Sequence, residues 1–177
     1  MSLHSVLSEK RAAILDRWHR LVLESYPAQT VEIMGRGKDP FENPVGATLS
    51  RELPVILGGF VDGKPAETSA ASLDAIVKIR AVQDFSPSQA ILFVYQIKRA
   101  IREELAGDPG KSGDAQEWLH LCEQIDELAL AAFDSYAASR EKICDIRINE
   151  MKKRVFVMEK ASRMLEEQED GPESGGS

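Results

Sequence analysis

The chain has 177 residues, of which 43% are hydrophobic and 29% charged, and its formal net charge is −7. This composition is typical of a globular protein with one domain of ordinary size and a buried core. No run approaches 18 consecutive apolar residues, and the first residues carry charges throughout, so the sequence predicts neither a transmembrane helix nor a signal peptide. The two cysteines form no disulfide framework, and we expect a cytoplasmic protein without membrane insertion.

Helix signals begin near the N-terminus. Apolar residues at helical spacing predict a first helix over residues 3–26, which Pro27 ends, followed by a loop to residue 43. Asn43 is a good N-cap with Pro44 at the first helical position, so a second helix should start there. Pro54 falls inside this helix and is expected to kink it or split it in two.

A third helix should start at Ser69 or Ser72 and end near Val82. The segment after it, residues 79–90 (IRAVQDFSPSQA), is the most informative part of the chain because it ends one helix and starts the next. Ser86 is an N-cap, Pro87 takes the first helical position, and Gln89 can close a capping box. We therefore expect a fixed corner here, followed by a fourth helix over residues 87–105.

The last helical stretch runs from about residue 114 to 167 and contains no Pro or Gly. Unbroken, it would be roughly 80 Å long, so we expect it either to break near residues 135–139 or to project. Its second half follows a heptad with spacings of four and three, which predicts a coiled-coil seam. The seam residues are Cys144, Ile148, Met151, Val155, Met158, Ser162 and Leu165. The alternative is a helix that packs back on the bundle.

Charge is spread unevenly over this end of the chain. Residues 140–163 carry eight basic and four acidic side chains, whereas residues 166–177 carry five acidic and no basic ones. The acidic tail is expected to be disordered. The basic run either contacts an acidic partner or is a solvated helix face.

No catalytic or metal-binding motif accompanies these elements. HExxH, CxxC and GxSxG are absent from the sequence, and no glycine-rich loop has the spacing of a phosphate site. The chain is acidic and has no helix-turn-helix signature, which argues against nucleic-acid binding. We expect no enzyme, no metal and no cofactor. His19 or His120 leaves a haem-binding sensor as an alternative.

Three segments together resemble a known family. They are Trp18 with Tyr26-Pro27, FENPVG at residues 41–46, and residues 79–90 with Phe93 after them. This combination is similar to the N-terminal sensor domain of RsbRD-type RsbT co-antagonists over roughly residues 5–140. The resemblance implies an all-helical signal-input domain of bacterial stress-response regulation that acts with STAS modules or histidine kinases. The related RsbR input domain is globin-like, dimeric and free of haem.

The resulting expectation is an all-α, globin-like bundle of five to six helices with a long C-terminal helix. Residues 1–140 form the sensor, residues 141–167 the signalling helix and residues 168–177 the tail. Since the chain ends soon after the long helix, we expect a stand-alone regulator or a fragment of a longer protein. The function expected is non-enzymatic: a homodimer senses a small ligand or partner protein and relays the signal through its C-terminal helix. A subunit that docks a larger complex is a further alternative.

Two groups of residues are candidates for the sensing site. The polar group could bind a ligand or partner, or could cap and brace the corner: Asn43, Arg80, Gln83, Asp84, Ser86 and Gln89. The aromatic group could line a pocket or be ordinary core: Trp18, Tyr26, Phe41, Phe85 and Phe93.

Overall fold

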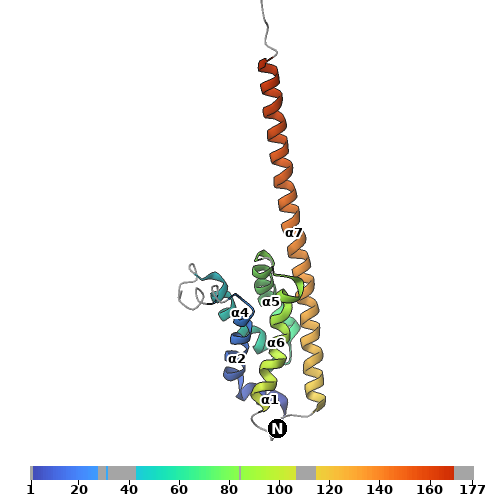
Figure 1. Ribbon diagram of the computed structural model, residues 1–177. Coiled ribbons are helices and arrows are strands. Elements are labelled where there is room, and N and C mark those ends of the chain that lie inside the picture. The colour runs from blue at the N-terminus through green and yellow to red at the C-terminus, as the bar shows by residue number, and fades with distance from the viewer. Residues whose placement is uncertain (1, 28–30, 32–42, 84, 107–114, 170–177) are drawn as a thin grey trace, which may run out of the picture. The chain divides into compact units, whose positions relative to one another are not determined.

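The computed structural model describes residues 2–27, 31, 43–83, 85–106 and 115–169, with side chains as far as residue 166. Over these residues the protein is all-α, without strands (Figure 1). Its helices are α1 (Leu3–Glu9), α2 (Arg11–Glu24), α4 (Pro44–Val61), α5 (Pro65–Val82), α6 (Pro87–Ala106) and α7 (Ala115–Glu169). The chain divides into two units, residues 1–139 and 140–177. No helix among the described residues has the length and apolar content needed to cross a membrane.

The first predicted helix is in fact two helices. Ser2 caps α1 by accepting a hydrogen bond from the Ser5 amide at 3.3 Å, and Lys10 leaves helical geometry at the junction with α2. The Lys10 ammonium donates to the carbonyl oxygen of Glu104 at 2.7 Å. This contact fixes the junction against α6, a tertiary effect that helical periodicity does not encode.

Helix α4 starts as predicted but does not break. The Asn43 side chain accepts a hydrogen bond from the Gly46 amide at 2.8 Å, which confirms the cap. The helix is continuous across Pro54, so the prediction of a split was wrong. Buried Leu53 and Ile56 on either side of the proline hold both halves in the core, and their burial outweighs the lost backbone hydrogen bond.

Helix α5 starts earlier than predicted. Pro65 occupies its first turn, and Ser69 and Ser72 are buried inside the helix rather than at its cap. Helix α4 approaches this end of α5 closely, because a Cβ atom on Gly59 would lie 3.0 Å from both the Pro65 Cα and the Ser69 Oγ. A proline start and close packing therefore decided the boundary, and the serine caps suggested by the sequence were wrong.

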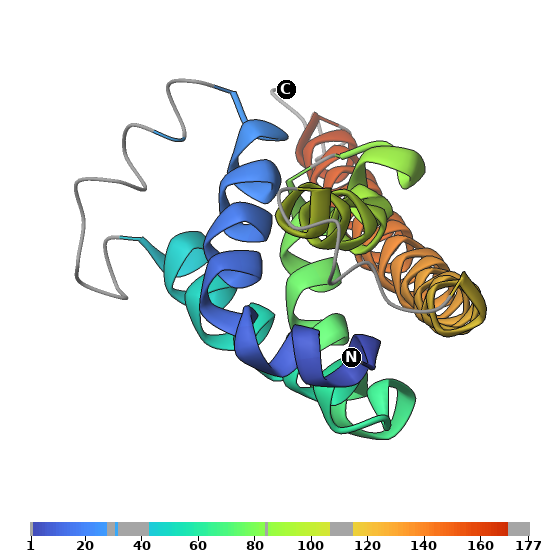
Figure 2. The ribbon, with the colours of Figure 1, turned by 90° about the horizontal axis from the view of Figure 1, so that it is seen from below.

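The core of the first unit lies between these helices. Helix α4 packs along α5, and α2 packs along α6 and against α4 (Figure 2). Trp18 is fully buried, and its indole N–H donates to the carbonyl oxygen of Phe93 at 2.7 Å. The first part of α7 closes the bundle with one buried face: Leu121, Ile125, Leu128, Ala129, Ala132 and Tyr136.

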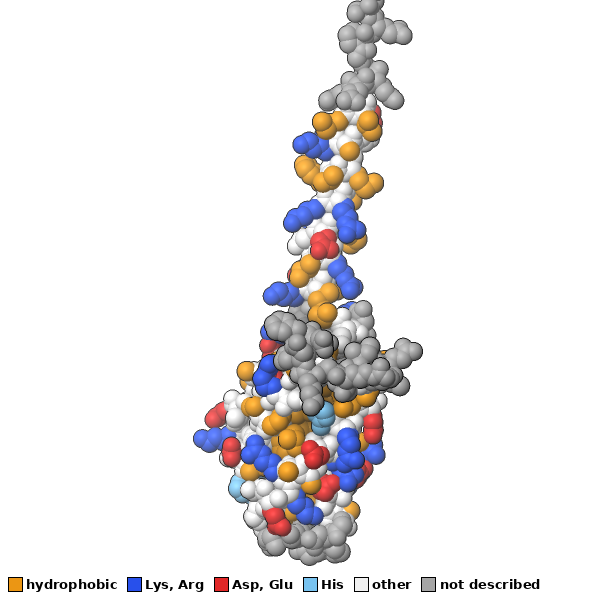
Figure 3. Space-filling view, turned by 90° about the vertical axis from the view of Figure 1, so that its left-hand side faces the viewer, with side chains coloured by type: hydrophobic (Ala, Val, Ile, Leu, Met, Phe, Trp, Pro, Cys, Tyr) orange, Lys and Arg blue, Asp and Glu red, His pale blue; other side chains and the backbone are white. Residues whose placement is uncertain are grey.

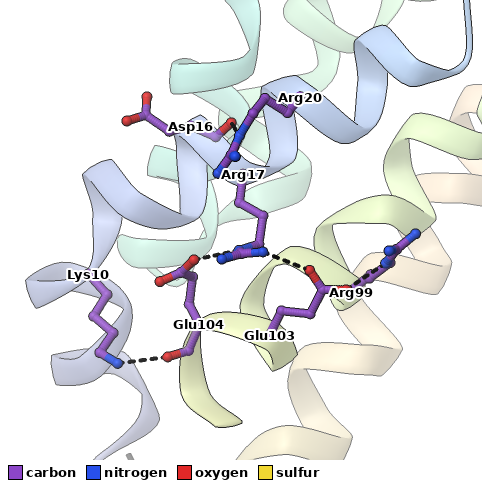
Figure 4. A network of polar contacts seen from close by, with 7 residues as sticks. All are labelled: Lys10, Asp16, Arg17, Arg20, Arg99, Glu103 and Glu104. Carbon is purple, nitrogen blue, oxygen red and sulfur yellow. Dashed lines mark hydrogen bonds and ion pairs between the residues drawn. The ribbon is translucent and has the colours of Figure 1, made fainter. Parts of the chain in front are cut away.

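An ion-pair network joins α2 to α6 at the surface (Figure 4). Arg17 contacts Glu104 at 2.5 Å and Glu103 at 3.0 Å, and Arg99 contacts Glu103 at 2.7 Å. The hydrogen bond from Arg99, helped by that from Arg17, lowers the pKa of Glu103. The network fixes the register of the two helices at the surface and adds little stability, because exposed pairs are screened by water.

Helix α7 is one continuous helix from Ala115 to Glu169, so the break considered near residues 135–139 does not occur. From Glu141 to Glu166 every described side chain except Ile143 is exposed. These exposed side chains include many large apolar ones: Ile146, Ile148, Met151, Val155, Phe156, Val157, Met158, Met164 and Leu165. A solvated helix with this composition has surface left to bury.

Candidate functional site: the corner around Arg80

The corner between α5 and α6 is closed by the predicted capping box. The Ser86 amide donates to the Gln89 side-chain oxygen at 3.1 Å, and the Gln89 amide donates to Ser86 Oγ at 3.4 Å. The Phe85 amide also reaches back to the carbonyl oxygen of Arg80 at 3.3 Å. These bonds satisfy backbone donors at the end of α5 and the start of α6, and they fix the direction in which α6 leaves the corner.

Arg80 is fully buried beneath this corner. Its guanidinium carbon lies 4.9 Å from the ring centroid of Tyr26, 5.0 Å from that of Phe85 and 5.2 Å from that of Phe93. The rings of Tyr26 and Phe85 meet edge to face with their centroids 5.1 Å apart. Three aromatic rings from three parts of the chain therefore surround one cation, which their π faces attract.

The hydrogen bonds of Arg80 all run to neutral groups. One Nη donates to the carbonyl oxygen of Gln89 and the other to Ser25 Oγ, both at 2.9 Å. Within the described part of the chain no carboxylate forms an ion pair with Arg80, and its Nε has no hydrogen-bond partner. Burial lowers the pKa of Arg80 and raises that of Tyr26. This geometry favours the bracing interpretation of Arg80, because its side chain is directed at protein groups.

The other predicted polar residues are not brought together in one site. Gln83, Ser86 and Gln89 are exposed on the corner, whereas Asn43 is buried and caps α4. Asp84 lies outside the described residues. The corner thus has a buried brace, Arg80, and an exposed polar rim made by Gln83, Ser86 and Gln89.

The predicted aromatic residues are mostly core. Trp18 bonds to the Phe93 backbone, and Tyr26, Phe85 and Phe93 enclose Arg80. Phe41 lies outside the described residues. In this arrangement the described rings fill the space around the guanidinium, whereas a ligand pocket would need that space to be empty.

Helix α7 is bonded to this corner through residues that the sequence did not single out. The Tyr136 hydroxyl donates to the carbonyl oxygen of Phe85 at 2.5 Å. The neighbouring Ser135 hydroxyl donates to an Asp74 carboxylate oxygen at 2.8 Å, and Asp74 also pairs with Lys78. The pKa of Asp74 is lowered, first by Lys78 and then by Ser135. Because Tyr136 is 51 residues from its partner, no local pattern could have revealed this contact.

The two histidines considered for haem lie in different environments. His120 is 70% exposed, and its Nδ1 is 3.7 Å from Glu123. It lines a cavity of about 210 Å³ between α1, the end of α4 and the start of α7. Small-molecule sites usually enclose about 300–1,000 Å³, so this cavity does not favour a tetrapyrrole. Over the described residues, no three His, Cys, Asp or Glu side chains are placed to hold a metal ion.

His19 is partly buried on α2, and its Nε2 has no hydrogen-bond partner among the described residues. Burial lowers its pKa below 6.5, and Asp16 opposes this only in part. The unfolded chain therefore binds a proton at His19 more readily than the folded protein does, and stability is lost as the pH falls below about 6.5.

We expect His19→Gln to remove this loss of stability at low pH. Urea titrations between about pH 7 and pH 5 measure it, with the exposed His4→Gln as the control. Identical pH profiles for wild type and His19→Gln would contradict the prediction.

Comparisons with known proteins assign most of the chain to one family. The family described as the RsbT co-antagonist protein rsbRD N-terminal domain matches residues 12–151. An uncharacterized protein of Archaeoglobus fulgidus is 26% identical over 164 residues, which cover 90% of this chain and 99% of the relative. No solved structure matches the chain. The family is one of regulatory input domains and is not known for enzymes. The chain belongs to the family of RsbT co-antagonist rsbRD N-terminal domains.

Proposed function

We propose that this protein is a homodimeric, non-enzymatic signal-input module in which the corner around Arg80 controls the C-terminal helix. A partner protein that contacts the exposed rim formed by Gln83, Ser86 and Gln89 shifts the packing of α5 and α6. Helix α7 then changes what it presents to the rest of a signalling complex. A small ligand is a weaker candidate for the signal, because the space around Arg80 is filled by protein side chains.

The observation that carries this proposal is the bond between Tyr136 and the Phe85 carbonyl oxygen. Phe85 covers Arg80 with its ring and belongs to the turn whose cap directs α6. Tyr136 stands five residues before Glu141, where the exposed part of α7 starts. Any movement of the corner that displaces the Phe85 backbone therefore acts on α7 directly.

An apolar patch on α6 and α7 supports dimer formation by the first unit. Lys98 pairs with Asp126 at 2.6 Å and lies 5.5 Å from the Tyr95 ring centroid, so Tyr95 and Asp126 flank the same lysine. Because Tyr136 reaches Phe85 and Asp126 reaches Lys98, the two helices run antiparallel. From Lys98 toward Phe85, α6 exposes Tyr95 and then Leu92. In the same spatial direction, from Asp126 toward Tyr136, α7 exposes Leu130 and Phe133. A second copy of the chain would bury them.

The heptad of the second unit supports a parallel pair. Ile148 and Val155 occupy a positions, and the d positions hold Cys144, Met151, Met158 and Leu165. β-Branched residues at a favour two parallel strands. In that register Arg154 at g faces Glu159 at e of the second copy, while Arg147 and Lys152 repel each other. The seam is therefore specific in direction and modest in strength.

Oxidative cross-linking tests the proposed dimer with residues that the chain already has. In a parallel dimer the two Cys144 side chains face each other, whereas an antiparallel pair centred on Val155 would separate them by about 33 Å. We expect mild oxidation to give disulfide-linked dimers of wild type and Cys122→Ser on non-reducing gels. The Cys144→Ser variant should stay monomeric on the same gels.

The same assay tests the relay from the corner. Tyr136→Phe removes the hydroxyl that bonds to Phe85 and leaves the ring in place. We expect this substitution to change the rate of Cys144 cross-linking severalfold, while Ser50→Ala, which removes an exposed hydroxyl of α4 far from the corner in sequence, leaves it unchanged. Equal rates in all three proteins would refute the relay, and the absence of a Cys144-dependent dimer would refute the parallel seam.

A further inference from the structure

The exposed helix has a second apolar face that the proposed seam leaves uncovered. Four of its large exposed side chains do not stand at a or d positions. Ile146 (50% exposed) lies earlier in the helix, and the other three are Phe156 (66%), Val157 (64%) and Met164 (56%). In the heptad numbering these three occupy b and c, on the side of the helix opposite the seam. A two-stranded coiled coil would leave all three in water.

These apolar residues alternate with basic ones. Lys153 and Lys160 are at f, and Arg163 is at b, all exposed. From 153 to 164 the outer positions of the helix thus hold three apolar and three basic side chains and no acidic one. Their order, Lys153, Phe156, Val157, Lys160, Arg163 and Met164, follows the three-and-four spacing of a single helix face. Figure 3 shows mainly basic and apolar side chains, and few acidic ones, on the visible side of the exposed end of the long helix.

We propose that this outer face, the 153–164 stripe, docks an acidic amphipathic helix of a partner protein. Such a helix would cover the three apolar side chains with its own apolar stripe and place carboxylates against the three basic ones. The inference rests on the proposed function in one respect, because the seam must be occupied by a second copy for the outer face to be the free one. It adds the chemical class of the output partner.

A partner helix fits the 153–164 stripe better than a membrane surface does. In a two-stranded coiled coil the outer faces of the two helices are directed away from each other, so a flat bilayer could contact only one of them at a time. Three apolar side chains also give shallow insertion, and the acidic residues that follow from Glu166 are repelled by anionic lipids. Two separate partner helices meet neither obstacle.

Fluorescence anisotropy with a synthetic peptide tests the proposal on the full chain. The probe is a labelled amphipathic peptide of roughly 18 residues, or five turns, with a leucine stripe flanked by glutamates. The same peptide with lysines in place of the glutamates is its charge control. The protein variants are the triple substitution Phe156→Gln, Val157→Gln and Met164→Gln, the charge reversal Lys153→Glu, Lys160→Glu and Arg163→Glu, and the matched single control Ile146→Gln. Glutamine and glutamate keep helix propensity, so these variants retain the helix.

We expect the acidic peptide to bind wild type and Ile146→Gln equally, and the triple glutamine variant at least about tenfold more weakly. The charge reversal should abolish binding, and the lysine peptide should not bind wild type.

Equal binding of the acidic peptide to wild type and to the triple glutamine variant, or no binding to wild type, would overturn the proposal. Binding of wild type to phosphatidylserine vesicles but not to the peptide would overturn it in favour of a membrane. Light scattering on each protein shows separately whether the dimer is present, so failure of the seam is distinguished from failure of the 153–164 stripe.

Discussion

Arg80→Ala is expected to lower the free energy of unfolding by about 3 kcal/mol or more. The substitution empties the space between three aromatic rings and removes both hydrogen bonds that tie α5 to Ser25 and to the start of α6. Large side chains deleted from a core cost both the lost contacts and the cavity left behind. Urea denaturation of the full chain measures the effect as a shift of the unfolding midpoint at constant slope.

Two further variants separate the causes of this loss. Arg80→Met keeps most of the volume and removes a buried charge that has no acidic partner among the described residues, so we expect a loss below about 1.5 kcal/mol. Arg99→Ala removes an exposed arginine of α6 and should change stability little. A loss in Arg80→Met as large as that in Arg80→Ala would show that the hydrogen bonds, rather than packing, hold the corner. A loss below about 1 kcal/mol in Arg80→Ala would contradict the brace itself.

The corner also shows which parts of the fold sequence reasoning reaches. The capping box of Ser86 and Gln89 and the cap at Asn43 were predicted, because a cap is decided by residues within three positions of each other. The environment of Arg80 was not predicted, since Ser25 lies 55 residues away along the chain. The sequence places Arg80 beside the corner, and only the three-dimensional packing shows that it is buried.

The errors in helix boundaries have the same origin. Periodicity alone extends the first helix across Lys10, where a contact with the α6 backbone ends α1. Ser69 has the chemistry of an N-cap, but the close packing of Gly59 makes it part of the interior of α5. Pro54 removes one hydrogen bond, which the buried residues around it outweigh. In each case a tertiary contact overrode a local preference.

The long helix is the reverse case. Its heptad pattern in the sequence predicts a contact between two chains, which the structure of one chain does not include. In the single chain the large apolar side chains of the heptad over residues 144–165 are exposed, so the seam remains a prediction. Its spacing has meaning only with a second helix beside it. The Ile148→Glu and Val155→Glu double substitution is therefore the most direct test, since glutamate preserves helicity and places four carboxylates at facing a positions of the dimer.

We expect this double variant to be a monomer of 19.6 kDa by light scattering at concentrations where wild type has twice that mass. The matched control, Ile146→Glu with Val157→Glu, adds the same charge on the outer face and should remain a dimer, because neither residue faces the seam. A wild-type mass of 19.6 kDa would contradict dimer formation altogether. A dimer that survives the seam substitutions would assign the contact to the patch of Leu92, Tyr95, Leu130 and Phe133 on α6 and α7, and the helix beyond residue 140 would then be free on both of its apolar faces to bind other proteins.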